Sequence, residues 1–235
     1  MNFLKAEWRK LAIINYEISP ETVSKYLPAG TELDFYNGKC YVSLVGFMFL
    51  NTKLLGIPVP FHRNFEEVNL RFYVKKKEGN EWKRGVVFIR EIVPKPALSI
   101  VANSIYKEHY TTMSMKNVMQ KKKDDLLIKY SWKDKNWYSL EILAENKQLP
   151  MISGSEFEFI TEHYYGFTKK GSKTSEYEVC HPKWNFYWVK NHKLQIDFEK
   201  IYGNDFKCLN HQRPASVMLA EGSEIIVKTK KYLMQ

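Results

Sequence analysis

The chain has 235 residues, of which 44% are hydrophobic and 15% aromatic, so it can bury a sizeable core. Its net charge is +10, but the lysines stand in short clusters beside expected turns, not along a stripe with interleaved aromatic residues. We therefore expect no nucleic-acid partner. No Ser/Gly run, Pro-rich spacer or internal repeat divides the chain, which favours a single domain over residues 1–235.

Cysteine usage and hydropathy bear on the compartment. Cys40, Cys180 and Cys208 are odd in number and far apart, which is typical of reduced thiols in a cytoplasmic protein. The first residues lack the apolar segment of a signal peptide. The longest apolar run, around residues 42–50, is too short to span a bilayer. The expectation is a cytoplasmic protein with no membrane partner.

The N-terminal region alternates between β-prone and turn-forming segments. Residues 11–16 predict a first strand. A short helix is expected from Pro20, because proline suits the first helical position and the serine before it can cap. Residues 32–36 and 39–49 are predicted to form a hairpin around an Asn-Gly turn of type I′.

The segment 64–74 is the most informative stretch, because its residues alternate as in a strand. One face carries Glu67, Asn69, Arg71 and Tyr73, and the other face is apolar. This pattern fits a half-buried strand whose polar face meets water. It equally fits a strand whose polar row lines a cavity inside a closed sheet, and periodicity does not choose between the two.

The remaining chain is rich in short β segments. Strand 64–74 is expected to pair with residues 85–90 across the loop 75–84. Helices are predicted over residues 97–107 and 193–202, and further strands over residues 125–132, 136–144, 156–167, 175–180 and 224–230. Many strands with few helices predict a mainly β (α+β) fold with an antiparallel sheet that is closed or folded over on itself.

The spacing of residues in the sequence gives few indications of a catalytic or metal-binding site. The chain has no glycine-rich phosphate loop, nucleophile elbow or paired-cysteine zinc site, and its histidines form no metal set, so no cofactor and no metal are expected. His163 is interpreted as a hydrogen-bonded structural residue. For the His181-Pro182-Lys183-Trp184 step, one interpretation is a tryptophan that caps a core, and the other is that His181 binds a ligand or orients Glu67.

A first resemblance rests on the order of several N-terminal features. Arg9, a strand, a short helix that ends in a Leu-Pro step, and then Phe65-Glu66-Glu67 resemble the N-terminal half of acetoacetate decarboxylases. The resemblance places that family's active-site arginine near Arg9 and its active-site glutamate on Glu67. Residues 97–112 are similar to the family's helix that leads into a Pro-Lys-Lys motif, which carries a Schiff-base lysine.

The chain differs from the acetoacetate decarboxylase family at the position of that lysine. The corresponding residues here are about 109–112, His-Tyr-Thr-Thr, and no lysine lies between Glu108 and Met115. Without the amine no imine forms, so decarboxylation of acetoacetate through a lysine Schiff base is not expected. Lys107 and Lys116 remain the candidates for an amine that has moved.

A closer resemblance is to the YqjF-like group of bacterial proteins within the same superfamily. It rests on the Phe65-to-Val74 strand, on Tyr110, on Thr161-Glu162-His163-Tyr164 and on the His-Pro-x-Trp step, and it covers nearly the whole chain. It implies an acetoacetate decarboxylase-like fold, a cone-shaped closed antiparallel β-barrel with a central cavity and flanking helices. It implies no function.

Two hypotheses about function follow. In the first, the protein binds a small acidic or keto-acid-like molecule in the cavity, because a guanidinium can hold a carboxylate with two hydrogen bonds. In the second, it is a small-molecule enzyme, lyase- or hydrolase-like, with Glu67 as acid/base and an arginine clamp. The enzyme hypothesis is favoured if Glu67 lies within hydrogen-bond reach of Tyr110 or His181 in an enclosed pocket.

The expected site residues are shared by both hypotheses. Glu67 is the candidate catalytic residue. The candidate ligand-binding residues are Arg9, Asn69, Arg71, Tyr73, Tyr110, Thr111 and His181. The expected partner is a small molecule, with a carboxylate as one candidate, and homo-oligomerisation is left open.

Overall fold

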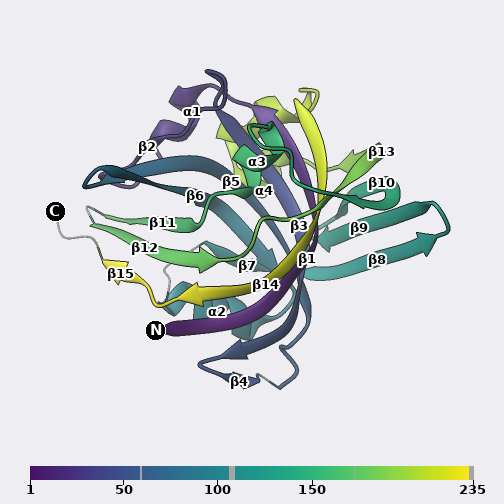
Figure 1. Cartoon of the computed structure of the whole chain (residues 1–235), viewed down its shortest axis with the longest axis horizontal. Helices are drawn as coiled ribbons and strands as arrows, with labels where there is room; N and C mark the ends of the chain where they lie inside the picture. The colour runs from purple at the N-terminus through teal and green to yellow at the C-terminus, as the bar shows by residue number, and fades with distance from the viewer. Residues whose placement is uncertain (59, 106–108, 172, 233–235) are drawn as a thin grey trace.

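The computed structural model describes residues 1–58, 60–105, 109–171 and 173–232, and side chains for all of these except residues 101–105 and 170. Its centre is a ring of seven strands, closed because β12 pairs with both β11 and β14 (Figure 1). In ring order the strands are β1 (Asn2–Glu17), β3 (Tyr41–Leu54), β5 (Phe65–Glu78), β6 (Glu81–Val93), β11 (Tyr165–Lys170), β12 (Lys173–Cys180) and β14 (Ser216–Lys228). The expected mainly β, closed sheet is confirmed.

The ring is closed by two short seams. Strands β6 and β11 run parallel and pair only through Gly85 with Tyr165 and Val86 with Gly166. Strands β12 and β14 pair through Val179 and Cys180. The other neighbours in the ring are antiparallel, so the sheet is antiparallel apart from the first seam and the short strand β7.

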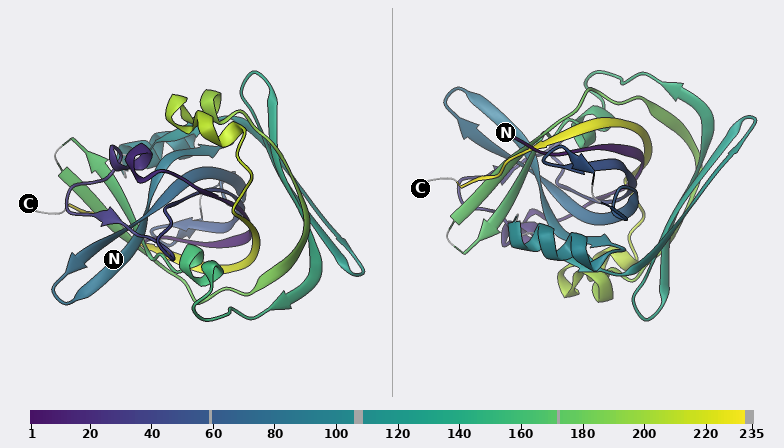
Figure 2. Two further views of the ribbon diagram at one scale, coloured as in Figure 1. Left: turned by 90° about the horizontal axis from the view of Figure 1, so that it is seen from above. Right: turned by 90° about the horizontal axis from the view of Figure 1, so that it is seen from below.

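The same sheet continues past β14 into an outer extension that we call the wing. It consists of β13 (Phe186–Gln195), β10 (Trp137–Leu149), β9 (Asp125–Lys133) and β8 (Ser114–Lys122). Figure 2 shows the wing curving past one side of the ring. The remaining strands are short: β2 (Glu32–Leu33), β4 (Ile57–Pro58), β7 (Tyr110–Thr112) and β15 (Lys231–Tyr232).

Helices are few and short in the described residues. They are α1 (Pro20–Ser24), α2 (Pro96–Ile105), α3 (Glu156–Thr161), α4 (Phe198–Tyr202) and the 3-10 helix η1 (Asn204–Asn210). None of these is long and apolar enough to cross a membrane. Cys40, Cys180 and Cys208 are all free thiols, and Cys40 is buried.

The buried side chains form two clusters, one on each face of the ring wall. Apolar residues of β5, such as Leu70 and Phe72, point outward and pack with the wing residues Ile128, Trp132 and Leu140. The inner cluster contains aromatic residues of β3 and its neighbours, described below. Alternation along β5 produces this division, because successive side chains of a strand leave opposite faces.

The sequence pattern predicted one strand over residues 156–167, and this prediction is wrong. These residues contain helix α3, followed by β11. The helix begins where the side chain of Ser155 accepts a hydrogen bond from the backbone nitrogen of Glu158, at 3.2 Å, and the Glu158 carboxylate accepts from the Gly154 nitrogen at 2.7 Å. These contacts satisfy one backbone donor in the first turn and one just before the helix, and they outweigh the β-prone aromatic residues.

Two other expectations need correction. The helix predicted over residues 193–202 starts only at Phe198, because residues 186–195 belong to β13. The predicted hairpin has its tight turn, with positive φ at Asn37 and Gly38, but only one bridge, between Tyr36 and Lys39, follows it. Strand β2 pairs instead with β5. The loop predicted between β5 and β6 is also shorter, since both strands extend to a turn at Gly79.

Candidate functional site

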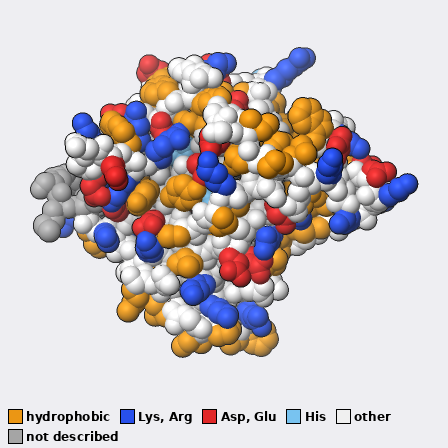
Figure 3. Space-filling view, viewed as in Figure 1, with side chains coloured by type: hydrophobic (Ala, Val, Ile, Leu, Met, Phe, Trp, Pro, Cys, Tyr) orange, Lys and Arg blue, Asp and Glu red, His pale blue; other side chains and the backbone are white. Residues whose placement is uncertain are grey.

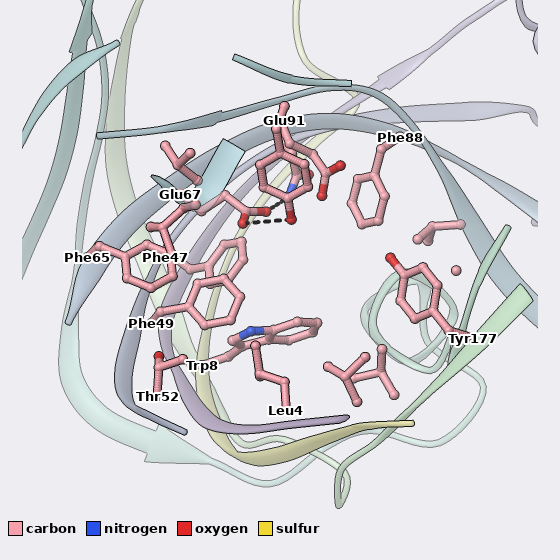
Figure 4. Close-up of a pocket in the computed structure, with 18 of the residues that line it drawn as sticks. Leu4, Trp8, Phe47, Phe49, Thr52, Phe65, Glu67, Phe88, Glu91 and Tyr177 are labelled. Atoms are coloured by element: carbon pink, nitrogen blue, oxygen red, sulfur yellow. Dashed lines mark hydrogen bonds between the residues drawn. The ribbon is translucent and has the colours of Figure 1, made fainter. Parts of the chain in front are cut away.

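A cavity of about 220 Å³ lies inside the ring (Figure 4). Most of its wall is apolar, and aromatic rings from β1, β3, β5 and β6 dominate it. These are Trp8, Phe47, Phe49, Phe65 and Phe88. The rings of Phe49 and Phe65 stack with centroids 4.7 Å apart, and Trp8 meets Phe47 edge-on at 5.3 Å. Such a wall favours an apolar or aromatic ligand body.

The polar row of β5 faces into this cavity. Glu67, Asn69 and Arg71 all line it, with exposed fractions of 2%, 1% and 8%. The Asn69 side-chain amide donates a hydrogen bond to Glu67 Oε1 at 2.9 Å, and the Tyr110 hydroxyl donates to Glu67 Oε2 at 3.4 Å. The polar face of the central strand is therefore internal, which periodicity left undecided.

Strand β6 adds a second carboxylate that sequence analysis did not find. Glu91 is 1% exposed, lies opposite Asn69 in the β5–β6 register and lines the cavity (Figure 4). A register shift near Leu70 and Arg71 changes which residues of β6 face inward. Regular alternation would put Arg90 inside with Phe88, whereas Arg90 points outward and donates to the Ile201 carbonyl. A bulge of this kind has no clear signal in one sequence.

His163 contributes an imidazole at the Arg71 end of the row. Burial lowers the pKa of His163 to about 4, so the ring is neutral near neutrality. Its Nε2 lies 3.1 Å from Asp34 Oδ2, which also accepts from Arg84 Nε at 2.6 Å. Burial acts to raise the pKa of Asp34, but these hydrogen bonds outweigh it and lower the pKa. Because Asp34 is ionised, the neutral ring donates from Nε2 and keeps Nδ1 as an acceptor.

Three buried polar atoms of the β5 row and of the adjacent His163 have no hydrogen-bond partner among the described residues. They are Asn69 Oδ1, Arg71 Nε and His163 Nδ1. An unsatisfied buried donor or acceptor costs on the order of 1–3 kcal/mol, so native proteins rarely leave one without a reason. Trp8 Nε1 and Thr52 Oγ1 elsewhere in the wall are likewise unsatisfied, so the cavity presents several groups able to hydrogen-bond a polar group placed in it.

Residues 5–224 match the protein family DUF2071, described as "Uncharacterized conserved protein (COG2071)". The chain belongs to this family. Its sequence is similar to the "Uncharacterized protein YqjF" of Bacillus subtilis (strain 168), with 25% identity over 186 residues, 77% of this chain and 74% of that protein. The YqjF-like resemblance seen in the sequence is thereby confirmed.

The fold of this DUF2071 chain is similar to that of acetoacetate decarboxylases. The enzyme from Legionella pneumophila superposes with a TM-score of 0.65 at 14% identity, over 99% of this chain and 87% of that one. The enduracididine biosynthesis enzyme MppR, solved in complex with pyruvate, gives a TM-score of 0.68 at 10% identity, over 100% of this chain and 91% of that one. These likenesses show the fold.

Some residues expected at the site do not line the cavity of this family member. Arg9 pairs with Glu7, with 2.7 Å between Nη2 and Oε2. The Tyr73 hydroxyl lies deeper along the row, 2.7 Å from Ser43 Oγ. Thr111 follows Tyr110 in β7 but is absent from the cavity wall.

His181 is also outside the cavity wall. Its ring stacks on Trp184 at 4.1 Å, and burial lowers the pKa of His181 to about 4. Trp184 is 2% exposed and its indole nitrogen donates to Ser223 Oγ at 2.8 Å. This arrangement agrees with the interpretation in which the tryptophan of the His-Pro-x-Trp step caps a core.

No lysine lines the cavity in the part of the chain that the structure describes. Lys116, one candidate amine, lies on β8 with its ammonium 4.2 Å from the Trp137 ring centroid. Lys107, the other candidate, lies outside the described residues. Within the same described ranges, no group of three His, Cys, Asp or Glu side chains is arranged to hold a metal ion.

Proposed function

We propose that the protein binds a small acidic or keto-acid-like molecule in the cavity without forming an imine. Arg71 holds the ligand's carboxylate, Asn69 and Glu67 contact the neighbouring polar atoms, and the rest of the ligand packs on the aromatic wall. One observation carries this proposal: a buried Glu–Asn–Arg row with unsatisfied polar atoms at one side of an otherwise apolar cavity. The pyruvate complex of MppR shows that this fold accommodates a keto acid in another protein.

The lysine pattern supports binding without covalent chemistry. No lysine occurs between Glu108 and Met115, and none lines the cavity among the residues described. Among the described residues, a keto acid in such a cavity meets no amine with which to condense.

The charges of the cavity predict how binding depends on protons. Glu67 and Glu91 bring two carboxylates, and Arg71 brings one cation. A bound carboxylate adds a further negative charge in a low-dielectric space, where like charges repel strongly. We therefore expect uptake of a proton on binding, measured by titration calorimetry in buffers that differ in ionisation enthalpy.

The test combines borohydride trapping with binding. The protein is incubated with pyruvate and with phenylpyruvate, reduced with borohydride and analysed by intact mass, and binding of the same acids is measured by calorimetry. The expected result is binding with no mass adduct, and tighter binding of phenylpyruvate because its ring meets the aromatic wall. An adduct on any lysine would refute the imine-free proposal.

A matched pair of variants tests the role of Arg71. Arg71→Met should weaken binding of the keto acid by at least about tenfold, since it removes a charged hydrogen-bond donor. Arg213→Met removes a guanidinium from an exposed position outside the cavity and should leave binding unchanged. Equal effects of the two variants, or no binding of either acid by the wild-type chain, would contradict the proposal.

A second function has a specific observation in its favour. The Tyr110 hydroxyl reaches Glu67, which is the convergence expected of a small-molecule enzyme of the lyase or hydrolase kind with Glu67 as acid/base. The buried Glu91 beside it could take part in proton transfer. Exchange of the protons next to the carbonyl of a bound keto acid, followed by NMR in D₂O, distinguishes this function from binding alone.

A further inference from the structure

Beneath the ring, the chain between β3 and β5 makes an excursion that we call the foot, which comprises the described residues from Leu54 to Arg63. Strand β4 folds back on the end of β3, with Ile57 opposite Leu54 (Figure 1). Three large apolar side chains of the foot face solvent: Leu55 is 58%, Ile57 70% and Phe61 89% exposed. Figure 3 shows hydrophobic side chains at this end of the molecule. Apolar exposure concentrated in one excursion indicates an interaction surface.

The backbone holds these side chains outward. Leu55 has a φ of 49° and Phe61 a φ of 60°, both in the left-handed region that bulky residues rarely adopt. The Leu55 nitrogen donates to the Phe3 carbonyl at 2.8 Å, and the Lys95 ammonium donates to the Phe61 carbonyl. The foot is therefore tied at both sides to the rest of the protein.

Lysine and arginine side chains lie around the exposed apolar residues of the foot. Lys5 and Lys53 lie directly opposite each other in the β1–β3 register, and both are exposed. Arg63 is exposed as well, and Lys95 reaches the foot from the start of α2. Like charges directly opposite each other in a sheet are destabilising, and an anionic surface relieves that repulsion. The carboxylate of Glu7, two residues after Lys5 on β1, already accepts hydrogen bonds from Arg9 and Asn51.

We propose that the foot docks on an anionic lipid surface. Ile57 and Phe61 enter the region between headgroups and acyl chains, while Lys5, Lys53 and Arg63 face the negative headgroups. This mode needs no spanning segment. A second copy of the chain is a poorer partner, because it would bring the same cations together at the centre of the contact.

The place of the foot gives docking a consequence for the cavity. Phe3, Thr52, Leu54 and His62 belong both to this end of the molecule and to the cavity wall. A docked protein therefore turns this end of the cavity toward the lipid, and a ligand with an apolar body could enter with little exposure to water. This consequence rests on the proposed function, whereas docking itself does not.

The experiment measures co-sedimentation of the full chain with vesicles of phosphatidylcholine alone and of phosphatidylcholine mixed with phosphatidylglycerol. We expect binding to the mixed vesicles, weakened by salt. The double variant Ile57→Ser/Phe61→Ser should bind the mixed vesicles about tenfold or more weakly. Trp188→Ser, which removes an exposed aromatic residue of the wing, is the matched control and should bind as wild type.

A second pair of variants separates a local surface from the general positive charge. Lys5→Glu/Lys53→Glu and Lys121→Glu/Lys122→Glu change the net charge equally, and all four lysines are exposed. Only the first pair should weaken vesicle binding. Equal loss in both pairs, or no loss in the Ile57/Phe61 variant, would overturn the proposal.

Light scattering tests the competing occupant of the foot. If the wild-type chain forms a dimer that the Ile57→Ser/Phe61→Ser variant loses, and vesicles do not bind, the surface belongs to a second copy and the proposal is wrong. Keto-acid binding is measured on the same variants without vesicles. It should be unchanged, so a failure of docking is distinguishable from a failure of the proposed function.

Discussion

The Tyr110 hydroxyl donates a hydrogen bond to Glu67 Oε2 at 3.4 Å, although 43 residues separate the two in sequence. Strand β7 brings Tyr110 there by pairing in parallel with the last residues of β6, where Glu91 lies opposite Tyr110. One short parallel strand thus places a phenol within reach of the buried Glu67 carboxylate. Glu67 is a site residue in both functional hypotheses, as a ligand contact in one and as the acid/base in the other.

Replacing Glu67 by Gln tests its role in binding. The variant keeps the shape of the side chain and the possibility of a hydrogen bond with Tyr110, but it removes the negative charge. Affinity for keto acids should rise by about tenfold or more, because the negative charge that repels the ligand's carboxylate is gone, and for the same reason the proton uptake coupled to binding should fall. Calorimetry measures both.

The control for this variant is Glu81→Gln, at an exposed position at the start of β6. It should affect neither affinity nor proton uptake. If Glu67→Gln merely unfolds while Glu81→Gln is normal in urea denaturation, Glu67 is a structural residue and the proposed site is wrong.

Tyr110→Phe separates binding from catalysis. The change removes one hydroxyl and leaves the ring against the cavity. If the protein only binds, affinity should fall by less than about tenfold, because a single long hydrogen bond is lost, and no exchange of ligand protons should occur in either protein. Exchange in the wild-type chain that slows in Tyr110→Phe, followed by NMR in D₂O, would establish the enzyme instead.

Buried histidines should make stability depend on pH. Burial lowers the pKa of His163 from 6.5 to about 4, so between these values the unfolded chain binds a proton that the folded chain does not. Stability is then complete above about pH 6.5 and falls as the pH drops toward 4, by at most about 3 kcal/mol for this residue. The free energy of unfolding in urea, measured across this range, tests the sign.

Histidine variants assign the effect. His181 has the same direction of shift, also from burial, so it contributes to the same window. His163→Gln should flatten the profile in part, whereas replacement of the exposed His211 by Gln should not change it. A profile that is already flat in the wild-type chain would contradict the lowered pKa values of these two histidines.

Gly166→Ala should obstruct the cavity from the β11 side. A Cβ on Gly166 would lie 2.2 Å from Cζ of Tyr177, whose ring lines the cavity, so this ring must move. We expect destabilisation of about 1–3 kcal/mol and weaker ligand binding, because overpacking displaces neighbouring groups. Gly154→Ala is a useful comparison: its Cβ meets nothing within 4 Å, its φ of 76° still causes strain, and ligand affinity should stay unchanged.

Local sequence patterns encode which side chains share a face of a strand, but not where that face lies in the fold. The alternation along β5 predicted which side chains share a face, because it depends only on neighbouring residues. That this face is internal depends on closure of the ring through seams of two residue pairs each, which no local pattern encodes. Glu91 was missed because a bulge changes the alternation of β6 at one point.

Local signals also competed with one another. The aromatic residues of segment 156–167 predicted a strand, but the reciprocal contacts of Ser155 and Glu158 start a helix there. A Ser-x-x-Glu step is visible in the sequence, and giving it more weight would have found α3. The position of His181 could not be predicted in this way. Its stacking on Trp184 follows from their place in the fold and has no local signal in the sequence.

The two hydrophobic clusters have different roles: the outer one stabilises the fold, and the inner one surrounds the cavity. Outward-facing residues such as Leu70 and Phe72, packed against the wing, supply cohesion that does not depend on the cavity. Inward-facing residues can therefore be exchanged for others of similar volume without removing the outer core. The inner surface of the ring can therefore be reshaped one position at a time, while the packing between the ring and the wing stays intact.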